Sequence, residues 1–244
     1  MATYKLTLEY CGTDFQGWAM QPGKRTVEAV LAGAVETVLT EQVKLTVAGR
    51  TDAGVHAWGQ VASFDSQRDA DPPLLERSLN GLLAHDIAVV GAERAPDGFD
   101  ARRDARSRSY CYRVLRRSDP SPFERGRALW WPHDFDEKSL GECAAALAGT
   151  HDFTAFTPTQ TGHTHFEREI VSARWDREGD IAAFRIEADT FMRHMVRVVV
   201  GTMLEVARGR GDVDEFVRLL EGAPRSAAGP TAEPHGLYLA SVSY

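Results

Sequence analysis

The order of apolar and polar residues along the chain predicts strands separated by helices. Over residues 27–39 the apolar side chains recur every three or four positions, which is the period of a helix with one buried face. Residues 43–48 and 58–64 are instead rich in β-branched and other apolar side chains, as strands are. The same patterns place strands at residues 4–10, 43–48, 58–64, 87–90, 109–115, 170–175, 181–187 and 237–243.

Local signals set the limits of the expected helices. Asp71 followed by Pro72 is a helix cap with a proline in the first turn, and Asp212 with Glu215 three residues later has the form of a capping box. Gly149 ends another helix, because glycine readily adopts the conformation that closes helices. The expected helices are residues 27–39, a segment that begins at 71–72, residues 137–148, residues 192–207 and a short segment after 212.

Both halves of the chain then have the element order β-α-β-β-α-β, which is the order of ferredoxin-like folds. We therefore predict an α+β protein in which residues 1–105 form one ferredoxin-like half and residues 106–244 form the other, with additions near the C-terminus. Two such halves can share a mostly antiparallel sheet by joining edge to edge, with the helices on one face, and this arrangement protects the inner edges.

The composition is that of a globular protein without a membrane segment. Of the 244 residues, 43% are hydrophobic and 26% are charged, which suits one large core or two modest ones. Three scattered cysteines form neither a disulfide framework nor a CxxC metal pattern, so a reducing compartment, the cytoplasm, is expected. The chain enters a strand at once, without the apolar segment of a signal peptide, and its most apolar stretch, residues 195–206, is too short to cross a bilayer.

Residues 49–57, with the sequence GRTDAGVHA, are the strongest candidate for chemistry. Two glycines flank Arg50 and Asp52, so the backbone can turn tightly between two expected strands. A carboxylate beside an arginine stays ionised at neutral pH, which is the state that a nucleophile or a base needs. The spacing alone favours a simpler alternative, an aspartate that makes an Asx turn in a hairpin.

The amino-acid sequence of this segment favours a catalytic role for Asp52 over a simple turn. GRTDAGVHA followed by GQVASF resembles the active-site loop of the tRNA pseudouridine synthase A family. Further similarities follow in family order along nearly the whole chain: YCGTDFQGW at residues 10–18, FDAR at 99–102, RSYCY at 108–112, GTHDFTAF at 149–156, FMRHMVR at 191–197, GPTA at 229–232 and GLYL at 236–239. The chain departs from the family pattern at Cys11, Ala19, Asp100 and Glu233-Pro234, which leaves the tRNA contacts less well defined than the catalytic group.

The resemblance implies a fold, an activity and roles for four residues. It implies two RNA-recognition-like halves with an active-site cleft between them, and isomerisation of uridine at positions 38, 39 or 40 of the tRNA anticodon stem-loop by a homodimer. Asp52 matches the catalytic aspartate and Tyr110 the tyrosine that binds the substrate. Arg197 matches the partner of that aspartate, and Arg50 a residue that contacts RNA. No cofactor is expected, because the reaction involves no redox change, hydrolysis or net loss of a group.

The placement of positive charge is consistent with an RNA partner, although the formal net charge is −7. Between Arg94 and Arg127 there are ten arginines against five acidic residues. Tyrosines 110 and 112 interleave with them, and aromatic rings can stack on bases. The expected RNA contacts are Arg102, Arg103, Arg106 and Arg108. A solvated surface strand is the simpler explanation of the same run.

Two other classes of function fit the sequence less well. A non-catalytic RNA-binding protein with paired RNA-recognition folds should carry an aromatic RNP1 octamer on a strand, and the sequence has none. A metal-dependent hydrolase would need a third ligand beside His163 and His165, which lie in a segment with the composition of a surface loop. We therefore expect no metal site. His56, within the candidate loop, is expected to fix loop geometry by hydrogen bonding and not to act as a general base.

Overall fold

The computed structural model describes residues 1–133 and 135–244, which form two compact units. Unit 1 consists of Met1–Arg106 and Tyr238–Tyr244, and unit 2 of Ser107–Leu237. The sequence division at residues 105 and 106 lies beside the first boundary, but it assigned the whole C-terminus to the second half. The difference arises because β10 (Leu237–Ser243) pairs with a strand of unit 1.

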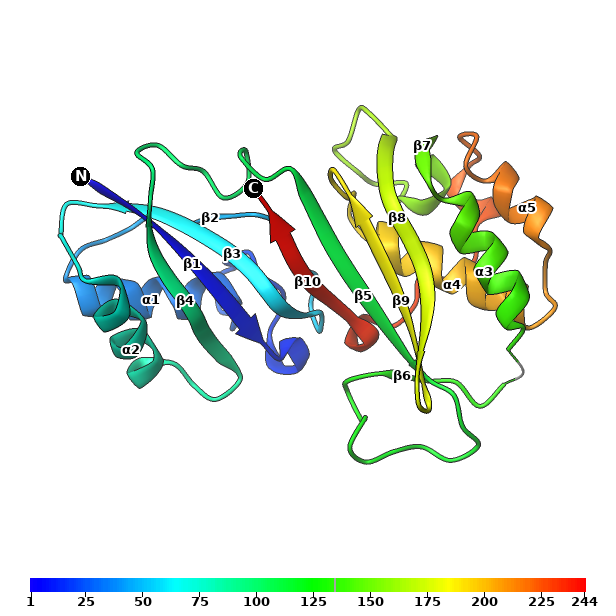
Figure 1. Cartoon of the computed structure of the whole chain (residues 1–244), viewed down its shortest axis with the longest axis horizontal. Helices are drawn as coiled ribbons and strands as arrows, with labels where there is room; N and C mark the ends of the chain where they lie inside the picture. The colour runs from blue at the N-terminus through cyan, green and yellow to red at the C-terminus, as the bar shows by residue number, and fades with distance from the viewer. Residues whose placement is uncertain (134) are drawn as a thin grey trace. The chain divides into compact units, whose positions relative to one another are not determined.

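Unit 1 has the element order β-α-β-β-α-β followed by the returning strand β10 (Figure 1). Its sheet has the order β4-β1-β3-β10, with β2 paired to β3. Strand β1 is antiparallel to β3 and β4, whereas β10 is parallel to β3. The elements are β1 (Ala2–Tyr10), a 3-10 turn (Gly12–Asp14), α1 (Val27–Leu39), β2 (Thr46–Val47), β3 (His56–Ser66), α2 (Pro72–Leu82) and β4 (Ile87–Ala95).

In unit 2, strands β5, β9, β8 and β7 are joined in that order by antiparallel pairs. Two-residue strand β6 adds to β5 in parallel. The β8–β9 hairpin turns at Gly179, which has a φ of 64°. The elements are β5 (Ser107–Leu115), β6 (Leu129–Trp130), α3 (Glu137–Ala146), β7 (Gly149–Asp152), β8 (Glu167–Glu178), β9 (Ile181–Ala188), α4 (Met195–Ala207) and α5 (Val213–Arg218).

Helix α4 is the central helix of unit 2. Eleven of its thirteen residues are buried, and only Arg197 and Glu205 interrupt the apolar surface. A helix that is apolar on all sides belongs inside a core, so both charged side chains require specific partners. Segment 229–232 crosses α4 in backbone contact, because a Cβ on Gly201 would lie 1.9 Å from the carbonyl oxygen of Pro230.

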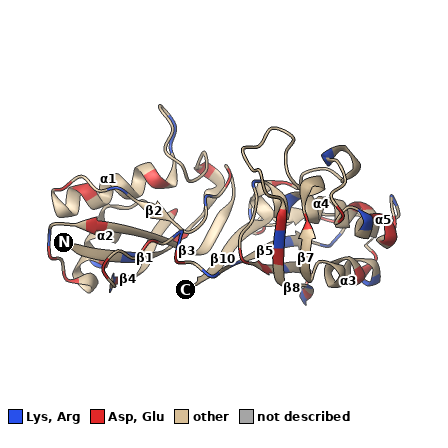
Figure 2. Ribbon diagram, turned by 90° about the horizontal axis from the view of Figure 1, so that it is seen from above, with Lys and Arg blue, Asp and Glu red and all other residues tan. Residues whose placement is uncertain are grey.

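The fold is thus a mixed α+β arrangement with mostly antiparallel pairing, as the sequence indicates. The expected strand at residues 43–48 is reduced to Thr46–Val47, and the expected helix at 192–207 begins only at Met195. The later start follows from His194, whose left-handed backbone (φ 62°) is incompatible with a continuous helix. None of the described helices is long and apolar enough to span a bilayer. Basic and acidic residues are interspersed along the ribbon of both units (Figure 2).

Candidate active site

The candidate loop, residues 49–57, lies in unit 1, where it follows β2 and ends in the first two residues of β3. The Val55 N–H donates to the carbonyl oxygen of Asp52 at 3.2 Å, and Gly54 has a φ of 78°. This is a tight turn closed by backbone groups, with glycine at the position that needs positive φ. The Asp52 side chain is half-buried and Arg50 is exposed. The turn therefore has a backbone hydrogen bond that does not depend on the Asp52 carboxylate.

Segment 10–18, the YCGTDFQGW motif, supports this loop through the backbone. The Trp18 N–H donates to Thr51 O at 3.0 Å, and the Gly54 N–H donates to Phe15 O at 3.3 Å. At residue 12 the two segments are so close that a Cβ there would lie 2.0 Å from Val55 O, which explains the glycine. Two motifs some forty residues apart in the sequence thus form one rigid structure.

A buried cluster of hydrogen-bonded side chains holds Gly49 and Thr51, the residues on both sides of Arg50. The Tyr10 hydroxyl and Thr51 Oγ1 are 2.8 Å apart, and Gln60 Nε2 donates to Tyr10 at 3.3 Å and to Gly49 O at 2.7 Å. Burial raises the pKa of Tyr10 to about 12, with the hydrogen bonds to Thr51 and Gln60 opposing that rise. Tyr10 is therefore a neutral phenol at physiological pH. Sequence reasoning gave no supporting role to Tyr10 or Gln60, because their contacts join segments that only the fold brings together.

The other side of segment 10–18 is fixed by a charged pair. The Arg25 guanidinium lies over the ring of Phe15, 4.0 Å from its centroid, and forms two hydrogen bonds to the Asp86 carboxylate at 2.7 and 2.9 Å. The hydrogen bond from Arg25 lowers the pKa of Asp86. A bidentate arginine–carboxylate pair has a fixed orientation, so it holds the ring of Phe15 in place. Phe15 in turn accepts the Gly54 N–H through its carbonyl oxygen.

Tyr110 and Arg197, the two substrate residues expected from the second half, lie in unit 2. Tyr110 is 9% exposed on β5, and its ring meets Phe191 edge to face with centroids 5.0 Å apart. Arg197 is half-buried on α4, and its Nε donates to Ala232 O at 2.8 Å. The Ala232 N–H donates back to Arg197 O at 3.0 Å. Because Asp52 belongs to unit 1, its pairing with Arg197 stays a prediction.

Segment 225–232 orients Arg197 and is itself held by a second arginine. Arg225 NH1 donates to the carbonyl oxygens of Ala228 and Gly229, and its NH2 donates to Thr231 Oγ1. The Gly229 N–H donates to Thr202 Oγ1 on α4 at 3.0 Å. Desolvation lowers the pKa of Arg225. Arg225 is thus a structural support for the segment that orients Arg197, and the sequence motifs gave no indication of it.

Two residues of β5 differ from their expected roles. Tyr112 was expected to stack on bases, but it is fully buried, and its hydroxyl donates to Glu233 O at 2.8 Å. Arg108 was expected to contact RNA, but it is 8% exposed and donates to Asp189 O at 2.8 Å. Both side chains are buried and donate to backbone carbonyl oxygens within unit 2.

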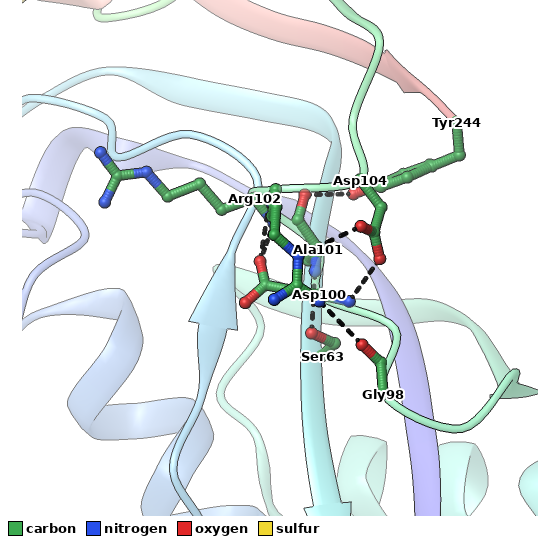
Figure 3. A network of polar contacts seen from close by, with 8 residues as sticks. Ser63, Gly98, Asp100, Ala101, Arg102, Asp104 and Tyr244 are labelled. Carbon is green, nitrogen blue, oxygen red and sulfur yellow. Dashed lines mark hydrogen bonds and ion pairs between the residues drawn. The ribbon is translucent and has the colours of Figure 1, made fainter.

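Arg102, Arg103 and Arg106 are exposed and follow β4 in unit 1. The Asp100 carboxylate accepts the N–H groups of Arg102 and Arg103, so the aspartate that departs from the family pattern caps this turn (Figure 3). Ala101 is fixed to Ser63 of β3 and to Tyr244 at the C-terminus. The Arg102 side chain extends away from this network in Figure 3. The turn is therefore a fixed base that presents arginines at the surface.

The histidines of the loop before β8 lie outside any metal-like grouping. His163 and His165 are exposed, and His165 Nε2 lies 3.8 Å from a Glu167 carboxylate oxygen. Within residues 1–133 and 135–244, no three His, Cys, Asp or Glu side chains are grouped so that they could bind a metal ion.

The comparison with known families rests on segments that include the candidate loop. A family model described as tRNA pseudouridine synthase matches residues 7–103 and 143–244, which is most of the chain. This chain belongs to the tRNA pseudouridine synthase family. The assignment makes it an isomerase. The matched segments of this synthase include Arg50, Asp52 and Arg197. Tyr110 lies between the two matched segments.

Curated relatives align with the synthase over its full length. A protein named tRNA pseudouridine synthase A from Myxococcus xanthus is 42% identical over 245 residues, covering 100% of this chain and 92% of the relative. Proteins of the same name from Xanthobacter autotrophicus and Bacillus pumilus are 39% and 38% identical, with coverage of at least 98% of each chain. A solved structure titled as a Cbf5-Nop10-Gar1 complex aligns with a TM-score of 0.36 at 12% identity, covering 84% of this chain and 54% of that one, which is too little to establish a shared fold.

Proposed function

We propose that this synthase converts uridine to pseudouridine at positions 38, 39 or 40 in the anticodon stem-loop of tRNA, with Asp52 as the catalytic carboxylate. The observation that carries the proposal is the Asp52 turn. Its backbone is fixed by segment 10–18, and it lies within the residues that match the family. Relatives that align over the full chain are named tRNA pseudouridine synthase A, which supports tRNA as the substrate.

The chemistry requires one bond to break and another to form at the same sugar carbon. The bond from uracil N1 to ribose C1′ breaks, the base turns, and C5 bonds to C1′ while the C5 proton is lost and N1 gains one. An ionised carboxylate can serve this sequence in two ways, by adding to C6 of the base or by accepting a proton from the ribose. Both routes place Asp52 against the reacting nucleotide, and neither needs a cofactor or a metal ion.

The other residues have binding and orienting roles in this proposal. Arg197 pairs with Asp52 and keeps it ionised, with the Ala232 carbonyl holding the guanidinium in place. Tyr110 receives the flipped uracil, because an aromatic ring offsets part of the few kcal/mol that unstacking a base costs. Arg50, exposed beside Asp52, contacts the RNA backbone. The proposal thus needs groups from both units to act on one uridine, within a homodimer in the cytoplasm.

The alternative is a non-catalytic RNA-binding protein with paired RNA-recognition-like units. The two functions differ in what happens to tRNA in cells. If the protein is the synthase, tRNA from a strain that lacks its gene should contain uridine at positions 38–40, and a plasmid copy should restore pseudouridine there. Unchanged pseudouridine at all three positions in the deletion strain would favour the binding role.

Binding of tRNA should depend strongly on salt through Arg103 and Arg106, despite the net charge of −7. Removing one arginine–phosphate pair reduces the slope of log affinity against log salt by about 0.7–0.9. Replacing both arginines by glutamate should therefore flatten the slope by roughly 1.5. Fluorescence anisotropy with labelled tRNA between about 50 and 200 mM salt measures the slope of log affinity against log salt.

The matched control for charge is the double substitution of Arg77 and Arg218, exposed arginines outside this turn, by glutamate. It changes the net charge equally and should leave the slope near that of the parent. Equal slopes for the Arg103/Arg106 variant and the parent would show that the RNA binds to another surface.

A further inference from the structure

Trp58 is the outer member of a column of three stacked aromatic rings. It follows the candidate loop directly in the sequence, on β3. The ring of Tyr238, from β10, lies against Trp58 with centroids 4.2 Å apart at 25°, and against His56 with centroids 4.6 Å apart at 21°. Residues 56 and 58 alternate along the strand and share one face, so the tyrosine ring fits between them. All three residues belong to unit 1.

The column is buried at one end and open at the other. His56 is 2% exposed and Tyr238 is 6% exposed, whereas Trp58 is 41% exposed. The buried end is joined to the support of the Asp52 turn, because His56 Nδ1 accepts the Gly12 N–H at 3.0 Å. The exposed indole is thus held flat against a rigid base that also fixes the candidate catalytic loop.

A flat, preorganised aromatic face beside a catalytic loop fits one kind of ligand best. Any nucleic acid base can stack on such a face. The stacking costs the protein little conformational entropy, because the ring is already held in place. The exposed Arg50 on the same loop supplies positive charge for the attached phosphate. A single indole is much smaller than the roughly 800 Å² that each partner buries in a stable protein interface. These features favour an unpaired nucleotide over a second protein chain.

We propose that Trp58 is a stacking platform for a nucleotide that neighbours the reacting uridine in the tRNA substrate. The inference rests on the proposed function and adds a binding residue to it. Trp58 contributes to holding the RNA while Asp52 acts on the uridine. Removing the platform therefore weakens substrate binding without slowing the chemical step.

The test compares Trp58→Phe with Trp58→Leu, using an unmodified tRNA transcript as the probe. Both substitutions keep an apolar side chain against Tyr238, but only phenylalanine offers a ring face. Trp58→Leu should raise KM and the Kd for tRNA about five- to one-hundred-fold, as loss of one stacked base does, with kcat within about twofold. Trp58→Phe should stay within about threefold of the parent in both constants.

The matched control is Trp130→Leu, because Trp130 is 42% exposed in unit 2 and stands outside the candidate loop. It should leave Kd, KM and kcat unchanged. Intrinsic tryptophan fluorescence gives a second measurement. Addition of tRNA should quench the fluorescence of the parent more than that of Trp58→Phe. It should quench the fluorescence of Trp130→Phe as much as that of the parent. This readout needs only the phenylalanine variants, so it holds if Trp58→Leu fails to fold.

The measurements distinguish failure of the proposed function from failure of the Trp58 proposal. If the parent forms no pseudouridine, the proposed function is wrong. If the parent forms it and Trp58→Leu has parental KM and Kd, the platform is wrong and the function stands. A fall in kcat with unchanged KM would show that Trp58 only supports the Asp52 loop. If Trp58→Leu changes the sedimentation coefficient but not the tRNA affinity, the indole contacts a second copy of the chain. Either result overturns the proposal.

Discussion

Replacing Asp52 by asparagine should abolish pseudouridine formation while tRNA binding is retained or improved. The amide is nearly the same size as the carboxylate, but it carries neither the charge nor the nucleophilic oxygen. Loss of a positioned proton-transfer group alone costs about 10²–10⁴-fold in rate, and loss of a nucleophile costs at least as much. The variant and the parent are compared by pseudouridine yield from a tRNA transcript and by anisotropy for binding.

The same substitution separates the catalytic role from the turn role. Asparagine is among the best replacements in an Asx turn, and the Val55 N–H bonds the residue 52 backbone, so the turn should persist. Asp97→Asn, at an exposed turn of unit 1, is the control and should be fully active. An Asp52→Asn protein that still converts uridine at a substantial fraction of the parental rate would show that Asp52 is a turn residue only.

Replacing Arg197 by methionine should reduce turnover roughly 10²-fold or more and leave the fold intact. Methionine fills the volume of the arginine stem and suits the apolar surroundings on α4. The substitution would leave Asp52 without its partner, and removing one member of a desolvated charge pair costs about 2–5 kcal/mol. Single-turnover rates with saturating enzyme measure the chemical step, and thermal unfolding reports on the fold.

Arg218→Met serves as the control, because Arg218 is an exposed arginine on α5 of the same unit. It should behave as the parent does. The pairing itself is open to direct observation in an experimental structure of the protein with RNA. Side chains of Asp52 and Arg197 more than about 6 Å apart, well beyond the 4 Å of an ion pair, would contradict it.

Secondary structure was predicted best where the signals are local. Helix α1 has the expected limits, and the caps at Asp71 and Asp212 both form, because each depends on residues a few positions apart. Strands β6 and β7 were missed, since two and four residues are too few to show a period. The pairing of β10 with β3 joins distant segments and leaves no local pattern, so its place in unit 1 was not predicted.

The candidate site was predictable in its central motif and not in its supports. The segment around Asp52 is distinctive as a sequence, whereas the contacts of Tyr10, Gln60 and Arg225 exist only once separate segments pack together. Alternation along β5 places Tyr110 and Tyr112 on one face, but it does not say which part of that face another segment covers. The Gly236 region covers Tyr112, which is why its expected base contact was wrong.

The most direct test of the account uses purified protein and a tRNA transcript that contains only unmodified uridine. Position-specific mapping after incubation should find pseudouridine at one or more of positions 38, 39 and 40, and at no other position. Transcripts with cytidine at each of these positions in turn identify which uridines react. A protein that binds the transcript but leaves every uridine unchanged would contradict the account and favour the non-catalytic alternative.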